Sequence, residues 1–215
     1  MVARGARLAA GVLLCATALA GCFNFDVGRR YPERRAYQLN VARDGSPHEA
    51  PRFPAVEIRR FRVSPAYAGR GFVYRTRDGS FESDFYNEFF VAPGAMIQQQ
   101  TAAWLTASGL FEAVVESGSR APIGLQVEGN VVAIYGDYSG PGAPEAVLEL
   151  QFLLSGPEGR TAQRNYSERV RAQGDDANGL VAAWNDALKR VFTNLEQDLM
   201  EGPGIAGRTD PPLSQ

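Results

Sequence analysis

A single histidine is the first residue to consider for chemistry in this chain. His48 lies in a proline-flanked segment, residues 44–54, that reads as a loop. Because the chain has no second histidine, neither a multi-histidine metal site nor a Ser/His/Asp triad held by regular structure can be built. We therefore expect His48 to be a solvated loop residue, and we predict neither a metal centre nor a cofactor.

Acidic residues are the other candidates for catalysis. Asp175 and Asp176 stand directly before a predicted helix, where helix capping already accounts for them. Glu82 and Asp84 share one face of a predicted strand and Asp137 lies near a turn, but nothing in the sequence brings these carboxylates together. A Gly-x-x-x-x-Gly-Lys phosphate loop is absent. We predict that the protein is not an enzyme, with a two-carboxylate hydrolase left open as an unsupported alternative.

One cysteine carries a stronger chemical signal. Two arginines precede an uncharged run from Leu8 to Gly21 that is too short to span a membrane, as in a secretory signal peptide. The run ends in Leu-Ala-Gly-Cys, which resembles the lipobox of bacterial lipoproteins, cleaved between Gly21 and Cys22. We predict that Cys22 is acylated and tethers the protein to the membrane. The alternative is an ordinary secretory peptide followed by a buried cysteine.

The lipobox and the composition of the two ends divide the chain into four parts. The predicted parts are a signal peptide (1–21), a lipidated N-terminus and tether (22–34), a folded domain (35–200) and a disordered tail (201–215). Phe23, rather than an aspartate, follows Cys22, which favours the outer membrane under enteric sorting rules. We expect a lipid-anchored protein of the bacterial envelope that faces the periplasm.

Hydrophobic periodicity predicts the elements of the domain. Strands are expected at residues 37–41, 56–63, 72–77, 81–85, 111–115, 123–135, 146–154 and 161–172. Helices are expected from Pro93 to Gly109 and over residues 178–200. A bulge is expected at Arg59 and Arg60, and a bend at Gly129. Strands outnumber helices without alternating with them, which predicts an α+β fold, a mostly antiparallel sheet with two amphipathic helices packed on one face.

Composition excludes several classes of protein. The chain has 215 residues, 45% of them hydrophobic and 21% charged, with a formal net charge of -2. These values are typical of an ordinary folded domain and exclude a disordered polyanion or a collagen-like repeat. Nucleic acid is not expected as a partner, because phosphate binding requires a strongly basic surface.

A dense aromatic segment is the candidate for a contact surface. Phe81, Phe85, Tyr86, Phe89 and Phe90 lie within ten residues of one another. The sheet core is the stronger interpretation for the first two. Adjacent residues of a strand point to opposite faces, so the last two divide between core and surface. We take Tyr86, Phe89 and Phe90 as the residues that contact a lipid surface or a partner protein.

The order of these features resembles the ABC-type transport auxiliary lipoproteins, the family of the paraquat-inducible protein C type. The resemblance rests on Tyr37-Gln38-Leu39, on residues 56–63 and 71–75, on the aromatic residues 85–90 with Pro93 after them, on Ser108-Gly109-Leu110-Phe111, and on the last helix with Trp184 and Leu188. It covers nearly all of the mature domain. One departure is Phe89, which stands near a position where the family often has a tryptophan.

The resemblance implies a non-catalytic accessory subunit of a transport system for lipids or hydrophobic solutes. Its partners would be an MCE-domain periplasmic protein and the permease and ATPase of the same ABC system. A homo-oligomer is left open, because the residues do not determine the oligomeric state. An envelope-assembly or structural outer-membrane lipoprotein without a transporter partner is the alternative. Neither the cargo nor its direction of travel follows from the residues.

Overall fold

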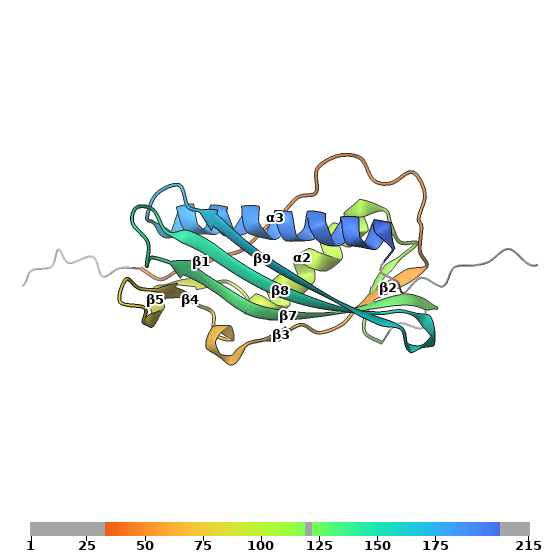
Figure 1. Ribbon diagram of the computed structural model, residues 1–215, viewed down its shortest axis with the longest axis horizontal. Coiled ribbons are helices and arrows are strands. Elements are labelled where there is room, and N and C mark those ends of the chain that lie inside the picture. The colour runs from red at the N-terminus through yellow and green to blue at the C-terminus, as the bar shows by residue number, and fades with distance from the viewer. Residues whose placement is uncertain (1–32, 119–121, 203–215) are drawn as a thin grey trace, which may run out of the picture. The chain divides into compact units, whose positions relative to one another are not determined.

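The computed structural model describes residues 33–118 and 122–202 of the chain. The predicted cleavage and acylation site at Gly21 and Cys22 lies outside these residues, as does nearly all of the predicted tether and tail. From Arg34 onward, one sheet carries two helices on one of its faces (Figure 1).

The sheet is organised around its longest strand, β7. The strands are β1 (Arg35–Tyr37), β2 (Ala55–Ile58), β3 (Arg62–Val63), β4 (Gly71–Arg75), β5 (Phe81–Phe89), β6 (Val114–Glu116), β7 (Ile123–Asp137), β8 (Glu145–Ser155) and β9 (Thr161–Arg171). One edge of β7 pairs antiparallel with β8, which pairs in turn with β9. Along its other edge lie β2, β3 and β4, each parallel to β7. β6 lies beyond β2, whereas β5 and then β1 lie beyond β4.

The predicted α+β class is confirmed, and the sheet is mixed. The long β7–β8–β9 ladder and the β4–β5 hairpin are antiparallel, as expected. The short strands β2, β3 and β4 are parallel to β7, and β1 is parallel to β5. Alternation of apolar residues is the same in both pairings, so the sequence pattern carried no information on strand direction.

Both helices begin and end where the sequence predicted. Helix α2 (Pro93–Ser108) has Pro93 in its first turn and ends at Gly109, whose φ of 69° is left-handed. Helix α3 (Ala177–Glu201) is capped by Asp176, whose carboxylate accepts a hydrogen bond of 2.8 Å from the backbone N–H of Gly179. Asp176, and not Asp175, is therefore the residue that caps α3. Two short 3-10 turns, η1 (Pro65–Tyr67) and η2 (Pro157–Gly159), complete the elements.

The main core lies between the sheet and the helices. The apolar residues that recur at three- and four-residue spacing along α3 are all buried: Leu180, Trp184, Ala187, Leu188, Val191, Leu195 and Leu199. Burial of each large apolar side chain contributes about 1.5–3 kcal/mol. Trp184 is fully buried and its indole N–H donates to the carbonyl oxygen of Val147 on β8 at 3.2 Å. Helix α3 is therefore fixed to the central strands of the sheet.

A second, smaller core explains why β8 is apolar on both faces. Val147 is fully buried on the side of the sheet opposite α3, together with Ala133 and Tyr135 of β7. Tyr67 of η1 and Val73 of β4 cover this cluster. This part of β8 is thus covered by the chain itself.

Two local predictions are corrected. The expected bulge at Arg59 and Arg60 is a complete break between β2 and β3, two strands that both pair with β7. β7 keeps its pairing with β8 through Gly129, where the bend was expected, and its register shifts between Val131 and Ala133 instead. A Cβ atom at Gly129 would lie 2.3 Å from the ring of Phe61. The glycine therefore makes room for an aromatic ring from the break between β2 and β3.

Residues 38–54 form a strap over the helices, seen in Figure 1 as the orange loop near α3. His48 is not a solvated loop residue, because its Nε2 lies 3.0 Å from a carboxylate oxygen of Glu196 on α3. The same carboxylate accepts hydrogen bonds from the guanidinium of Arg43 at 2.8 Å and from the indole of Trp104 at 2.9 Å. We call Glu196, Arg43, His48 and Trp104 the Glu196 cluster.

The start of the strap also corrects the first predicted strand. Only Tyr37 of the expected 37–41 strand belongs to β1, and Leu39 and Val41 come after it. Leu39 is nevertheless fully buried, and the backbone N–H of Val41 donates to the side-chain carbonyl of Gln100 on α2 at 2.9 Å. Side chains of the helices thus provide the hydrogen bonds that a neighbouring strand would otherwise supply.

Candidate docking surface

Strand β5 and the residue after it present a row of exposed aromatic side chains. Phe81 is 53% exposed, Phe85 66%, Tyr86 42% and Phe90 62%. We call these four residues the aromatic ridge. The core interpretation of Phe81 and Phe85 is therefore wrong. Exposed apolar patches of this kind on a folded domain mark surfaces that bind other molecules.

Phe89, predicted as a contact residue, belongs to the core instead. It is 2% exposed, and its ring centroid lies 4.6 Å from that of Phe72 and 5.3 Å from that of Trp184. Phe90 follows it and points outward, as alternation along a strand requires. Tyr86 and Phe90 are therefore the predicted contact residues that reach the surface, while Phe89 fastens the end of β5 to α3.

A departure from regular pairing pushes the middle of the ridge outward. Gly71 of β4 pairs with Glu88, whereas Val73 pairs with Ser83, so residues 84–87 bulge out of the β4–β5 ladder. A Cβ at Gly71 would lie 2.7 Å from the carbonyl oxygen of Asp84. Only glycine at this position lets β4 approach the bulge so closely.

Asp84 holds the bulge in shape. Its carboxylate accepts hydrogen bonds from the hydroxyl of Tyr74 at 2.6 Å, the backbone N–H of Tyr86 at 2.7 Å and the side-chain amide of Asn87 at 2.7 Å. We call Asp84 and these three donors the Asp84 knot. Partial burial raises the pKa of Asp84, but hydrogen bonds from Tyr74 and Asn87 outweigh burial and hold it below its usual value. The knot turns Phe85 and Tyr86 toward solvent.

Charged groups border the ridge. The guanidinium of Arg34 lies 4.8 Å from the centroid of the Phe85 ring, and it pairs with Glu88 at 3.3 Å. Arg70 pairs with the other oxygen of Glu88 at 3.2 Å. An apolar centre with a polar rim is the usual anatomy of a protein interface.

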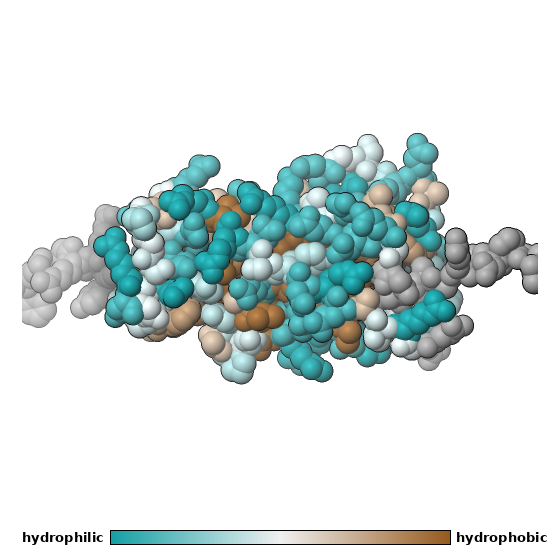
Figure 2. All heavy atoms as spheres, in the orientation of Figure 1, coloured by the Kyte–Doolittle hydropathy of each residue, from teal (hydrophilic) through white to brown (hydrophobic). Residues whose placement is uncertain are grey.

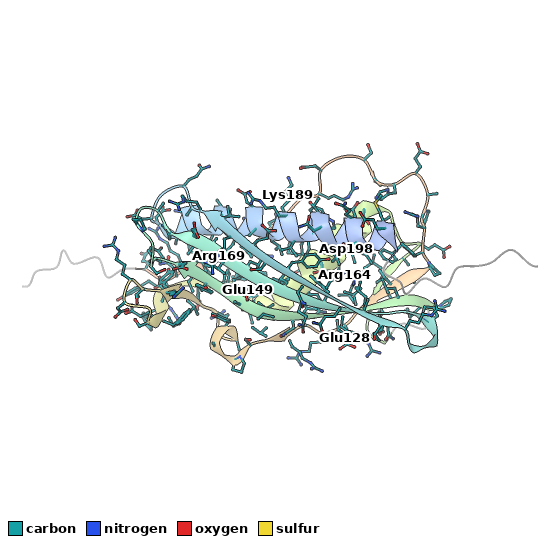
Figure 3. The ribbon with its side chains drawn as sticks, viewed as in Figure 1. Glu128, Glu149, Arg164, Arg169, Lys189 and Asp198 are labelled. Carbon is teal, nitrogen blue, oxygen red and sulfur yellow. The ribbon has the colours of Figure 1, made fainter. Side chains whose placement is uncertain are left out.

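The surface formed by α3 and β9 differs from the ridge. Figure 2 shows a mainly hydrophilic surface over α3 and β9. Arg164 of β9 pairs with Asp198 of α3 at 3.4 Å (Figure 3), and Arg190 pairs with Glu168 at 3.8 Å. Because these surface charges are already paired with one another, a partner that contacts them would gain little binding free energy.

Most carboxylates considered for catalysis have structural roles. Asp176 caps α3, and Asp137 accepts hydrogen bonds from the hydroxyl of Ser139 at 2.6 Å and from Arg169 at 3.2 Å. Asp84 is the centre of its knot, so Glu82 does not form a carboxylate pair with it. Among residues 33–118 and 122–202, no group of three side chains has the composition of a metal site.

The sequence showed the residues of this surface but not their arrangement. Phe85 and Asp84 were both considered, one as a core residue and the other as a possible acid. Asp84 followed by Asn87 was the sequence signal for the bulge. Aspartate and asparagine side chains form hydrogen bonds to nearby backbone groups and interrupt regular strands.

Comparison with known proteins places the chain in a family. A family model described as ABC-type transport auxiliary lipoprotein component matches residues 37–195. No curated protein matches the chain. Among the described residues, none of the helices combines the length and hydrophobicity that membrane crossing requires.

Two solved structures share the fold. Protein XCC0632 from Xanthomonas campestris has 20% identity and a TM-score of 0.67, and the match covers 78% of this chain and 96% of that chain. An uncharacterized protein has 17% identity and a TM-score of 0.62, with 78% of this chain and 99% of that chain covered. Since the family model spans most of the α+β domain described above, this chain belongs to the ABC-type transport auxiliary lipoprotein family.

Proposed function

We propose that this protein is a non-catalytic accessory subunit of an MCE-type ABC transport system for lipids or hydrophobic solutes. In this proposal, Cys22 carries the acyl anchor, the domain faces the periplasm from the outer membrane, and the aromatic ridge binds the MCE-domain protein. The MCE-domain protein links this lipoprotein to the permease and the ATPase of the system.

The observation that carries the docking proposal is that the aromatic ridge is exposed and yet rigidly supported. Phe85 is 66% exposed, yet the backbone beneath it is held by the hydrogen bonds of the Asp84 knot. An aromatic side chain on a rigid support loses little conformational entropy on binding, and buried aromatic residues supply much of the free energy at protein interfaces. The aromatic ridge combines exposed aromatic side chains with a rigid support, and the charge-paired face of α3 and β9 has neither property.

The position of the ridge relative to the anchor supports the same proposal. β1 begins at Arg35 and pairs directly with β5, so the tether enters the domain beside the ridge. The stretch from Cys22 to Arg34 can reach at most roughly 40 Å when fully extended. Such a tether confines the ridge to a thin layer above the membrane and raises its effective concentration for a partner that extends into that layer.

The absence of catalysis is part of the proposal. Asp84, Asp137 and Asp176 are occupied by hydrogen bonds that shape a bulge, a turn and a helix start. His48 bonds to Glu196 within the Glu196 cluster. These contacts support a binding role over a hydrolase.

Affinity capture from membranes tests the proposal. The full-length tagged protein is purified in mild detergent from its own bacterium, and bound proteins are identified by mass spectrometry. We expect an MCE-domain protein to be recovered. The double variant Phe85→Ser/Tyr86→Ser should lower its recovery about tenfold or more, because truncated interface aromatics typically cost at least about 2 kcal/mol. Met200→Ser is the matched control, since Met200 is a 36% exposed apolar residue outside the ridge.

Three outcomes would overturn parts of the proposal. Recovery of cell-wall or outer-membrane assembly proteins in place of an MCE-domain protein would support a structural lipoprotein. Equal recovery with the ridge variant and with Met200→Ser would remove the ridge from the interface. An unmodified residue 22 in mass spectra of the mature protein would exclude the anchor.

A further inference from the structure

A cavity lies beside the ridge, between the β4–β5 hairpin and the start of α3. Its volume is about 700 Å³, which is within the usual range of small-molecule sites. The side chains that line it and carry the argument below are Arg35, Tyr74, Arg77, Glu82, Tyr138 and Asp175. They come from β1, the β4–β5 hairpin, the segment after β7 and the segment before α3.

Two tyrosine rings form the aromatic wall of the cavity. The centroids of Tyr74 and Tyr138 are 5.3 Å apart, and the ring planes are inclined by 76°. Both hydroxyls are bonded, that of Tyr74 to Asp84 at 2.6 Å and that of Tyr138 to the carbonyl oxygen of Asp175 at 3.3 Å. The two rings are therefore held in place.

A glycine makes this aromatic wall possible. A Cβ atom at Gly136 of β7 would lie 3.2 Å from each of the two tyrosine rings. It would also lie 2.7 Å from a methyl carbon of Leu180 on α3. Aromatic faces set at the mouth of a cavity attract organic cations through the negative potential of the ring.

The walls also carry both signs of charge. Glu82, Asp175 and Asp176 supply carboxylates, and Arg35 and Arg77 supply guanidinium groups. The carboxylate of Asp176 also caps α3 and interacts electrostatically with Arg35. Within the described part of the chain, none of these five makes an ion pair shorter than 4.0 Å, in contrast to the paired charges of β9 and α3. A simple anion in the cavity would be repelled by the carboxylates, and a simple cation would be repelled by the arginines. A ligand with both charges satisfies both sets.

We propose that this cavity binds a zwitterionic phosphoethanolamine group. Its ammonium lies against Tyr74 and Tyr138 and pairs with Glu82 and Asp175, and its phosphate is bound by Arg35 and Arg77. The group comes either from a free phosphoethanolamine or from the headgroup of a phospholipid. The lipid source rests on the proposed transport function, whereas the binding itself does not.

Titration calorimetry on the full-length protein in maltoside micelles tests the site. We expect saturable binding of O-phosphoethanolamine, and at least tenfold weaker binding of inorganic phosphate and of ethylamine. Glu82→Gln, Arg77→Gln and Tyr138→Leu should each weaken binding of O-phosphoethanolamine about tenfold, which corresponds to about 1.4 kcal/mol. The matched controls are Glu49→Gln and Arg60→Gln, exposed charged residues that do not line the cavity. They should leave binding unchanged.

Lipid extraction distinguishes the two sources. Lipids that co-purify with the wild type and with Glu82→Gln are quantified by mass spectrometry. Enrichment of phosphatidylethanolamine over phosphatidylglycerol in the wild type, lost in the variant, identifies the lipid headgroup. Calorimetric binding without such enrichment identifies free phosphoethanolamine, and both results support the site. If O-phosphoethanolamine does not bind, or if inorganic phosphate binds as tightly and Glu82→Gln has no effect, the proposal is wrong.

Two sets of variants distinguish a failure of the cavity proposal from a failure of the proposed function. The cavity variants should still capture the MCE-domain protein. The variant Phe85→Ser/Tyr86→Ser should still bind O-phosphoethanolamine, because neither residue lines the cavity.

Discussion

The carboxylates of Glu196 and Asp84 each accept several hydrogen bonds, but their partners lie at very different distances along the chain. Glu196 bonds to Arg43, His48 and Trp104, which are 153, 148 and 92 residues away in the chain. Asp84, by contrast, receives its bonds from residues at most 10 positions away.

The separation of the hydrogen-bonded partners along the chain indicates a different role for each carboxylate. Bonds between distant segments close long loops and exist only in the folded domain, so the Glu196 cluster stabilises the tertiary structure. Bonds between neighbours shape a local segment, so the Asp84 knot shapes a surface. Substitutions at the two carboxylates should therefore separate stability from partner binding.

The largest effect is expected at Glu196. Glu196→Gln should lower the free energy of unfolding by about 3 kcal/mol or more, because it removes the charge that pairs with the largely buried guanidinium of Arg43. Urea denaturation followed by circular dichroism measures the change. Asp186→Asn is the matched control on the exposed side of the same helix, and it should stay within about 0.5 kcal/mol of wild type. Equal losses at both positions would contradict the role of the cluster.

A smaller loss of stability and a larger loss of function are expected at Asp84. Asp84→Ala should cost about 1–2 kcal/mol, since the hydrogen bonds to this carboxylate lie at a partly exposed edge. Recovery of the MCE-domain protein should fall as far as with the ridge variant. Glu82→Gln, on the same strand, should retain full recovery. A variant of Asp84 that captures the partner normally would separate the knot from the ridge.

Acid should distinguish Glu196→Gln from the wild type. Burial raises the pKa of Glu196, but the hydrogen bonds from Arg43 and His48 outweigh burial, so its pKa in the folded protein is lowered. Its stabilising contribution is therefore complete above the unfolded pKa of about 4.3 and is lost as the pH falls through the lower folded value. Denaturation curves between about pH 6 and 3 should fall less steeply for Glu196→Gln than for wild type. Identical slopes would contradict this assignment.

The smallest effect is expected at Arg34. Arg34→Gln removes an ion pair with Glu88 and the contact with the Phe85 ring, but the side chain of Arg34 is 54% exposed. The free energy of unfolding should change by less than about 1 kcal/mol, because water and salt screen both contacts. A loss as large as that of Asp84→Ala would show that the rim stabilises the ridge as much as the Asp84 knot does.

Elements with strong local signals were predicted well. Pro93 and Gly109 mark the two ends of α2, and the apolar spacing of α3 identified its buried stripe. The turn between β4 and β5 has Gly79 at a φ of 86°, and Asp78-Gly79-Ser80 between two strand patterns is a hairpin signal that depends on local sequence alone. Each of these features depends on residues a few positions apart, so a single sequence contains them.

Contacts between distant segments were not predictable in this way. Phe89 and Phe90 are chemically identical neighbours, and only the packing of Trp184 against the sheet decided which of them is buried. The alternation of apolar residues could not show that β2, β3 and β4 run parallel to one edge of β7. His48 likewise gained its carboxylate partner from a helix 148 residues later.

The helices, the β4–β5 hairpin, the candidate anchor at Cys22 and the family resemblance could all be predicted before folding was considered, because each rests on local spacing or on a short motif. Folding of the whole domain selects which aromatic residues form the ridge, which acids are structural and where charges of both signs surround a cavity. Those outcomes depend on side chains from separate strands and helices meeting in space, and their free energies arise only when the chain is packed.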